Sequence, residues 1–137
     1  LQPEAVVRQA AADFLNSGLA EGYPFEIDVP DTPMTTINAD AVLLHRALTN
    51  LLNNCVRHNP PGAAIHMAAR ERGKDCVFIV ESDAPASAAT AVGGITADGN
   101  AAHGTGLKLV AQIAQAHGGH ARFTAGKCFR CEIVLPK

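Results

Sequence analysis

Two asparagines, Asn50 and Asn54, are four residues apart in a segment with helical periodicity. Residues at this spacing lie on the same face of an α-helix. Amide oxygens suit a hard cation such as Mg²⁺, which usually brings its own waters and phosphates. Arg57 lies close to this face, and its guanidinium can pair with phosphate. The pattern indicates a site for a metal-bound phosphate, although an ordinary polar helix face would show the same spacing.

A second candidate is the pair of glycines, Gly104 and Gly106, before the predicted last helix. Glycines at a helix N-terminus let free backbone N–H groups approach an anion, and the helix dipole favours that contact. The preceding residues 84–104 are small, glycine-containing and non-periodic, which predicts a long loop. A mobile loop beside an anion site would act as a lid. The alternative is a tight turn with no ligand.

The elements that would position these groups follow from the periodicity. Helical spacing predicts helices over 4–19, 41–58 and 106–117, the second capped by Asp40 and the third ended by Gly118-Gly119. Strands are predicted over 25–29, 35–37, 64–69, 76–81, 121–125 and 129–135. The order of elements predicts an α/β (α+β) two-layer sandwich, in which helices pack on one face of a mixed β-sheet.

Length and composition bound the class of protein. The 137 residues are 47% hydrophobic and 18% charged, which predicts a single globular domain over 1–137. The net charge of −2 argues against nucleic acid as a partner. No apolar run approaches the length of a membrane span, so we expect no membrane contact by this domain. The chain begins at Leu1 rather than methionine, so we expect it to be a piece of a longer protein.

Four cysteines are too few and too irregular for the framework of a small secreted domain. Cys128 and Cys131 have zinc-like spacing, but no second pair completes four ligands. We therefore expect them to be strand residues in a reducing cytoplasm, and a metal or redox role is the minor alternative.

Together the motifs resemble a known family. Residues 50–58 read Asn-Leu-Leu-Asn-Asn-Cys-Val-Arg-His, and Pro60 and Gly62 follow. This stretch resembles the N box of the ATP-binding domain of bacterial sensor histidine kinases. Residues 104–119 resemble the family's second glycine box and its helix. The similarity spans nearly the whole chain, and it implies the Bergerat ATP-binding fold of the GHKL ATPases, with ATP and Mg²⁺ as ligands.

The resemblance also implies a role for individual residues. Asn54 matches the asparagine that coordinates Mg²⁺, and Asn50 matches the catalytic polar residue that helps to hold the metal or its water. Arg57 matches the residue that meets the phosphates, and His58 matches a ring near the nucleotide. The end of the ATP lid, over 84–104, would surround the phosphates through Gly104, Thr105, Gly106 and Leu107.

The first glycine box departs from the family pattern. Residues 80–86 read Val-Glu-Ser-Asp-Ala-Pro-Ala, so Ser82 replaces the family's adenine-binding aspartate, and alanines replace both glycines. A serine hydroxyl accepts a hydrogen bond without the charge, which costs roughly 10- to 100-fold in affinity. In the other register Asp83 takes the role, but it would lie on the opposite face of the strand. Lys108 replaces a third glycine, and it either reaches a phosphate or points to solvent.

The resemblance implies a domain that presents ATP–Mg²⁺ for phosphoryl transfer in two-component signalling. None of the six histidines is followed by an acidic residue, so the phosphoacceptor would lie on an upstream dimerisation domain of the same protein. A response regulator would be a further partner, and the domain would be cytoplasmic, in a parent that can be membrane-bound. The main alternative is a nucleotide-binding-impaired docking or regulatory module. A related serine kinase acting on an anti-sigma-factor antagonist is a third reading.

Overall fold

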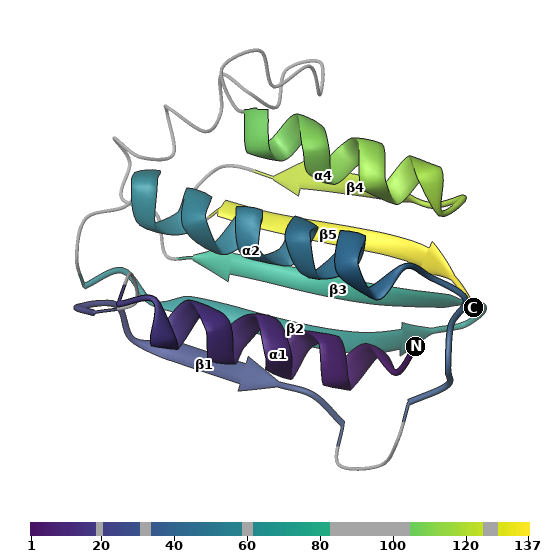
Figure 1. Ribbon diagram of the computed structural model, residues 1–137, viewed down its shortest axis with the longest axis horizontal. Helices are drawn as coiled ribbons and strands as arrows, with labels where there is room; N and C mark the ends of the chain where they lie inside the picture. Colours follow the sequence, from purple (N-terminus) through teal and green to yellow (C-terminus); the bar gives the residue numbers. More distant parts are fainter. Residues whose placement is uncertain (19–20, 31–33, 59–61, 83–104, 125–128) are drawn as a thin grey trace.

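Within the residues that the structure describes, a five-stranded mixed sheet forms one layer, and three helices cover one of its faces (Figure 1). The computed structural model describes residues 1–18, 21–30, 34–58, 62–82, 105–124 and 129–137. The helices are α1 (Pro3–Asn16), α2 (Ala41–His58) and α4 (Thr105–Ala116). The strands are β1 (Phe25–Asp28), β2 (Ile65–Arg72), β3 (Asp75–Ser82), β4 (His120–Thr124) and β5 (Phe129–Pro136). This architecture confirms the predicted two-layer sandwich.

The order of strands across the sheet is β1-β2-β3-β5-β4. Only β1 and β2 are parallel, and the other neighbours are antiparallel. The register places Ser82, the last residue of β3, beside Ile65 and Phe129. The end of β3 is therefore a central position of the sheet, next to the starts of β2 and β5.

The core lies between the sheet and the helices. Alternate side chains of the central strands point toward the helical layer, as the period of a strand requires. The largest fully buried side chains come from α1, α2, β2, β3 and β5, among them Val7, Leu44, Leu48, Leu51, Leu52, Met67, Phe78, Ile133 and Leu135. This continuous apolar core binds the three helices to the strands as one folding unit.

The helix α2 has the amphipathic pattern that its sequence predicts. The backbone N–H groups of Val42 and Leu43 donate to the Asp40 side chain at 2.9 and 3.1 Å, which confirms Asp40 as the N-cap. The helix packs against α1, α4 and β3. Its apolar face therefore fixes its orientation on the sheet, and its C-terminal turns carry the two asparagines.

The first helix and the segment over 35–37 differ from their sequence predictions for identifiable local reasons. The first helix ends at Asn16 rather than at residue 19, because Ser17 bonds back to Phe14 and Gly18 adopts a φ of +82°. The predicted strand over 35–37 is wrong. Its backbone donors bond elsewhere: Thr35 to the Glu71 carboxylate at 3.0 Å, and Ile37 to the Leu1 carbonyl at 3.0 Å.

Carboxylate side chains hold this irregular segment in place. Glu4 is buried, and its carboxylate accepts the backbone N–H of Met34 at 2.9 Å. The pKa of Glu71 is held below its usual value mainly by hydrogen bonds from Thr35. The contact with Lys137 lowers it further. A strand ladder would need neighbouring backbone partners, and these side chains replace them.

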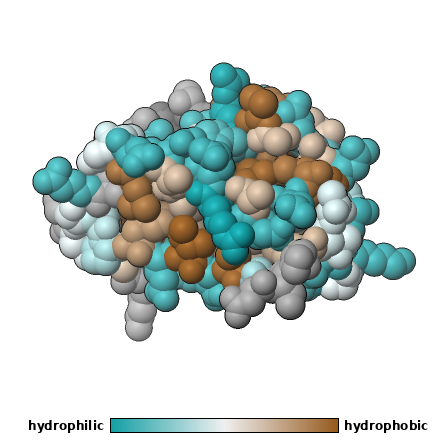
Figure 2. Space-filling view, turned by 60° about the horizontal axis from the view of Figure 1, so that its bottom comes forward, coloured by the Kyte–Doolittle hydropathy of each residue, from teal (hydrophilic) through white to brown (hydrophobic). Residues whose placement is uncertain are grey.

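The edge strand β1 carries charged residues on both sides of Ile27, which is 36% exposed. A hydrogen bond from Arg70 holds the pKa of Asp28 below its usual value. Viewed from the side of this edge, hydrophilic and hydrophobic areas are interleaved (Figure 2). Charges beside an edge strand discourage pairing with another chain.

The side chain of His117 joins the end of α4 to the start of α2. Its Nδ1–H donates to the Ile113 carbonyl at 2.8 Å, and its Nε2 accepts the Asp40 backbone N–H at 2.9 Å. A carbonyl can only accept, so this contact fixes the tautomer with the proton on Nδ1.

We expect His117→Ala to lower the free energy of unfolding by about 1–2 kcal/mol, because both hydrogen bonds are lost. Chemical denaturation monitored by circular dichroism measures the change. His120→Ala is the matched control, since that side chain is exposed at the start of β4, and a change of under about 0.5 kcal/mol is expected there. Equal losses in the two variants would contradict the bridging role.

Candidate functional site

The ends of three secondary-structure elements lie at the same end of the helical layer (Figure 1). They are the C-terminal turns of α2, the C-terminal end of β3 and the N-terminus of α4. The two helices are antiparallel and pack against each other, and α2 also contacts β3. The N-terminus of α4 therefore faces the same end as Asn50 and Asn54. This arrangement brings the two sequence motifs together, although 50 residues lie between Asn54 and Thr105, the first residue of α4.

Asn54 is the most unusual residue of this site. Its side chain is only 5% exposed, and its amide nitrogen has no hydrogen-bond partner among the residues that the structure describes. A buried unsatisfied polar group costs about 1–3 kcal/mol. A bound ligand that pairs with this amide removes that cost. The amide can also turn by 180° to present its oxygen instead, so it fits a cation with its own water and phosphate oxygens.

Asn50 lies one turn before Asn54 on the same helix and is half-buried. Asn53, by contrast, is exposed. As their spacing predicted, Asn50 and Asn54 lie on one face of the helix, and Asn53 lies outside that face. The chemistry open to this face is coordination or hydrogen bonding by neutral amides.

The floor of the site is made by Ser82 and Cys55. Ser82 is 2% exposed, and its side chain hydrogen-bonds the thiol of Cys55 in α2. Strand alternation places Ser82 on the helix-covered side of the sheet with Phe78 and Val80, which are also buried. Of the two residues considered for the first glycine box, Ser82 therefore lies under α2, while Asp83 falls outside the described residues.

Burial raises the pKa of Cys55 to about 12, against a hydrogen bond from Ser82 that lowers it. The folded state therefore favours the neutral thiol, and its stabilising effect is complete below about pH 9, the ordinary pKa. As the pH rises from about 9 to about 12, the thiol ionises only in the unfolded chain, and stability falls.

We expect this thiol to contribute a slope of about 1.4 kcal/mol per pH unit in that range. Denaturation curves of wild type and Cys55→Ala, recorded at several pH values above 9, measure it. The variant should lose stability less steeply than wild type. Parallel slopes would show that Cys55 ionises equally in both states.

Two supporting residues were not predicted from the sequence. The Tyr23 hydroxyl donates to the Val56 carbonyl in the last turn of α2 at 3.2 Å, which ties that turn to the segment before β1. Cys55 follows the apolar periodicity of α2 in the sequence, which predicts a buried position and nothing more. Its role beneath Ser82 has no signal in the sequence, because it depends on how α2 crosses β3.

For several predicted site residues, the structure describes only the backbone or does not describe the residue at all. Arg57 and His58 belong to the last turn of α2, and Thr105, Gly106 and Leu107 to the first turn of α4, but only their backbone is described. Gly104, Asp83 and the loop predicted over 84–104 fall outside the described residues altogether. Lys108 is exposed in α4, which agrees with the solvent-facing alternative.

The described parts of the chain show neither a metal-binding cluster nor a membrane span. There, no cluster of three or more His, Cys, Asp or Glu side chains is placed to bind a metal. Cys131 is a free buried thiol in β5, as expected for a strand residue. None of the described helices combines the length and apolarity that a membrane crossing requires.

Comparison with known proteins decides the family. Residues 39–137 match the sequence profile of the histidine kinase-, DNA gyrase B-, and HSP90-like ATPases. The chain belongs to this ATPase family. The matched range contains both asparagines, Ser82 and the whole of α4.

Two curated relatives of this ATPase domain are bacterial sensor proteins. The alginate biosynthesis sensor protein KinB of Pseudomonas aeruginosa is 27% identical over 96% of this chain and 23% of its own length. The sensor protein CzcS of Cupriavidus metallidurans is 33% identical over 92% of this chain and 28% of its own length. The chain thus spans about a quarter of the relatives that it matches.

Solved structures show the same fold. The catalytic domain of histidine kinase ThkA superposes with a TM-score of 0.82 at 16% identity, covering 100% of this chain and 94% of that one. The mycobacterial sensor histidine kinase MprB gives a TM-score of 0.73 at 22% identity, covering 99% and 96%. These structures confirm the fold, while the family match and the sensor-protein relatives support an ATP-binding domain of the sensor histidine kinase type, as the sequence motifs predicted.

Proposed function

We propose that this domain binds ATP with Mg²⁺ at the C-terminal end of α2 and presents the γ-phosphoryl group to a histidine on a preceding domain of its parent protein. The observation that carries the proposal is the buried amide of Asn54, whose nitrogen has no partner among the described residues and would be satisfied by a ligand. Membership of the ATPase family supports ATP as that ligand.

The residues of the domain would divide the work as follows. Asn54 and Asn50 would hold the metal ion and its water, and Arg57 would pair with phosphate oxygens. The free N–H groups at the start of α4, with Gly104, Thr105, Gly106 and Leu107, would meet the phosphates. The bound Mg²⁺ supplies neutralisation of phosphate charge, and the protein's part is mainly positioning.

The residues at the floor of the site would recognise the base. Ser82 can accept or donate one hydrogen bond, and Asp83 follows it in the chain. His58 would lie near the nucleotide, as the family resemblance implies. A phosphohistidine would form as the imidazole nitrogen of the preceding domain bonds to the γ-phosphorus and ADP leaves.

The docking or regulatory module remains the second candidate function, and one observation favours it. Ser82 is uncharged and hydrogen-bonded to Cys55, so the site offers no described carboxylate to the base. The two functions differ in nucleotide affinity. A response regulator and a cytoplasmic location belong to the same proposal and are supported by the sensor-protein relatives.

The test uses the parent protein and this domain side by side. Incubation with ATP labelled at the γ-phosphate should produce an acid-labile, alkali-stable phosphoryl group on the parent and none on residues 1–137 alone. Asn54→Ala in the parent should remove most of the label, while Asn53→Ala should retain it. A parent that binds nucleotide but never becomes labelled would contradict phosphoryl transfer to histidine.

A further inference from the structure

The last turn of α2 is followed by residues that cannot complete its hydrogen bonds. In an α-helix each carbonyl accepts the N–H of the residue four positions later. For Val56 that residue is Pro60, and for Arg57 it is Pro61. Proline has no backbone N–H, so neither proline can donate the regular helical bond. The carbonyls at a helix C-terminus then need donors from elsewhere in the molecule.

Tyr23 supplies a donor to the first of these carbonyls. Its hydroxyl donates to the Val56 oxygen at 3.2 Å, across 33 residues of the chain. The Tyr23 ring is half-buried and packs against the main core, as the Val56 side chain does. The core therefore holds the hydroxyl in place beneath the end of α2, where it caps a carbonyl that Pro60 cannot serve.

The segment that carries Tyr23 is bound to the chain that follows α2. The Gly62 N–H donates to the Gly22 carbonyl at 2.7 Å, and the Ile65 N–H donates to the Pro24 carbonyl at 2.8 Å. The second bond lies at the start of the parallel pairing between β1 and β2. Two backbone hydrogen bonds thus flank the Tyr23 side chain and fix its position relative to β2.

The bond to Val56 acts on the residues that the proposed function places around the phosphates. The Val56 carbonyl and the Arg57 N–H belong to one planar peptide unit, so a partner that holds the oxygen also holds the backbone entering Arg57. Asn54 lies two residues before this unit in the same helix, and its side chain is 5% exposed. A ligand that contacts Asn54 and Arg57 together requires the turn between them to keep one shape.

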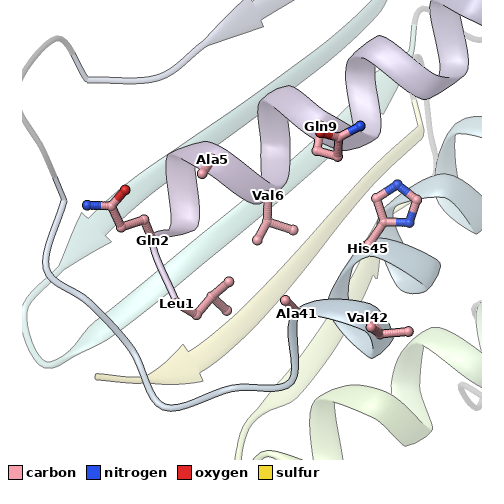
Figure 3. Close-up of a pocket in the computed structure, with 8 residues that line it drawn as sticks. All are labelled: Leu1, Gln2, Ala5, Val6, Gln9, Ala41, Val42 and His45. Atoms are coloured by element: carbon pink, nitrogen blue, oxygen red, sulfur yellow. The ribbon is translucent and has the colours of Figure 1, made fainter.

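The opposite end of α2 is held by other groups. Asp40 caps its first turn, which faces the first turns of α1 across a hollow with a mainly apolar lining (Figure 3). His45, which also lines the hollow, is paired with Asp13 of α1 at 2.6 Å. The backbone amides over 41–48 therefore report on the helix as a whole, and those over 53–58 report on the turn that Tyr23 holds.

We propose that Tyr23 is a positioning residue of the nucleotide site, and that its hydrogen bond to Val56 sets the affinity of that site. The inference rests on the proposed function for the identity of the ligand. Tyr23 acts through the peptide unit between Val56 and Arg57, without touching the nucleotide. It holds the last turn in the binding geometry before the nucleotide arrives. Pre-organisation of this kind raises affinity, because the binding step no longer includes the cost of ordering the turn.

A bond at the end of α1 provides a matched control. The Ser17 hydroxyl donates to the Phe14 carbonyl at 2.6 Å, so it too joins a hydroxyl to the last turn of a helix. The helix α1 carries none of the residues proposed to hold nucleotide. Tyr23→Phe keeps the ring and removes the hydroxyl, and Ser17→Ala removes the corresponding hydroxyl at α1.

Calorimetric titration of Mg²⁺–ADP into residues 1–137 tests the proposal. We expect Tyr23→Phe to weaken binding roughly two- to tenfold, the range that one hydrogen bond can supply. Ser17→Ala should bind as tightly as wild type. Both variants should lower Tm by about 2–6 °C. Well below Tm nearly every molecule stays folded, so lost stability alone does not change the affinity.

Hydrogen exchange followed by mass spectrometry examines the turn itself. In Tyr23→Phe the backbone amides over 53–58 should exchange roughly two- to tenfold faster than in wild type. The amides over 41–48 should keep their wild-type rates. Saturation with Mg²⁺–ADP should remove most of the difference over 53–58, because the bound nucleotide orders the turn.

The outcomes separate this inference from the proposed function. Wild-type affinity in Tyr23→Phe would overturn the inference alone, and faster exchange over 53–58 would then make Tyr23 a structural cap only. An equal loss of affinity in Ser17→Ala would overturn it too, since the cause would be general stability. A wild-type domain that binds no Mg²⁺–ADP would overturn the proposed function, and the positioning role with it.

Discussion

Replacing Asn54 with alanine is expected to weaken binding of a magnesium–nucleotide complex by roughly 10- to 100-fold. The side chain is 5% exposed, and its amide nitrogen lacks a partner among the described residues. In the free protein this burial is a cost, so its removal should leave the domain at least as stable as wild type. The same substitution thus changes binding and stability in different directions.

Asn53→Ala is the matched control for this prediction. It removes the same chemical group one residue earlier, from an exposed position, and it brings the same gain in helix propensity. Calorimetric titration gives the affinities, and thermal unfolding without nucleotide gives the stabilities. A purely structural asparagine would show the reverse result, in which Asn54→Ala unfolds at a lower temperature and both variants bind alike.

Gly119→Ala is expected to be the most destabilising small substitution in the domain, with a loss of about 3 kcal/mol or more. A Cβ at this position would lie 1.9 Å from the backbone oxygen of Val134 and 3.0 Å from the Leu135 side chain. The oxygen belongs to β5, which pairs with both β3 and β4 and cannot move freely. The close approach of α4's exit to β5 therefore requires glycine.

Gly118→Ala distinguishes this steric effect from backbone strain. Gly118 has a φ of +78°, and an added Cβ would meet only the Pro136 ring at 3.8 Å. Its loss should be about 1 kcal/mol, the cost of a left-handed conformation for alanine. In thermal unfolding, Gly119→Ala should lower Tm by about 10 °C, several times the effect of Gly118→Ala. Similar shifts in the two variants would exclude the contact with Val134 as the cause.

Much of the fold was predictable because local signals agreed with the final packing. The apolar stripe of α2, its Asp40 cap and the glycines after α4 all appear in the structure as the sequence indicated. The strand expected over 35–37 was wrong for a physical reason. The backbone donors of Thr35 and Ile37 bond to the Glu71 carboxylate and the Leu1 carbonyl, and that of the adjoining Met34 bonds to Glu4; all three acceptors are distant in sequence.

The motifs of the candidate site could be predicted from the sequence, but the contacts that hold them in place could not. Asn50 and Asn54 share a helix face because their spacing requires it, so they could be paired in advance. The contact of Cys55 with Ser82 and the bond from Tyr23 to Val56 depend on how α2 lies across the sheet. Periodicity predicts which face of a helix is buried, but it does not predict which residues that face meets.

The central claim is that the C-terminal end of α2 binds a magnesium–nucleotide complex. Isothermal titration of residues 1–137 with ADP and with a non-hydrolysable ATP analogue, each with and without Mg²⁺, tests it most directly. The account predicts micromolar dissociation constants that weaken when Mg²⁺ is withheld and when Asn54 is alanine. Absence of heat and of any thermal shift at millimolar nucleotide would contradict the claim and would favour the docking module.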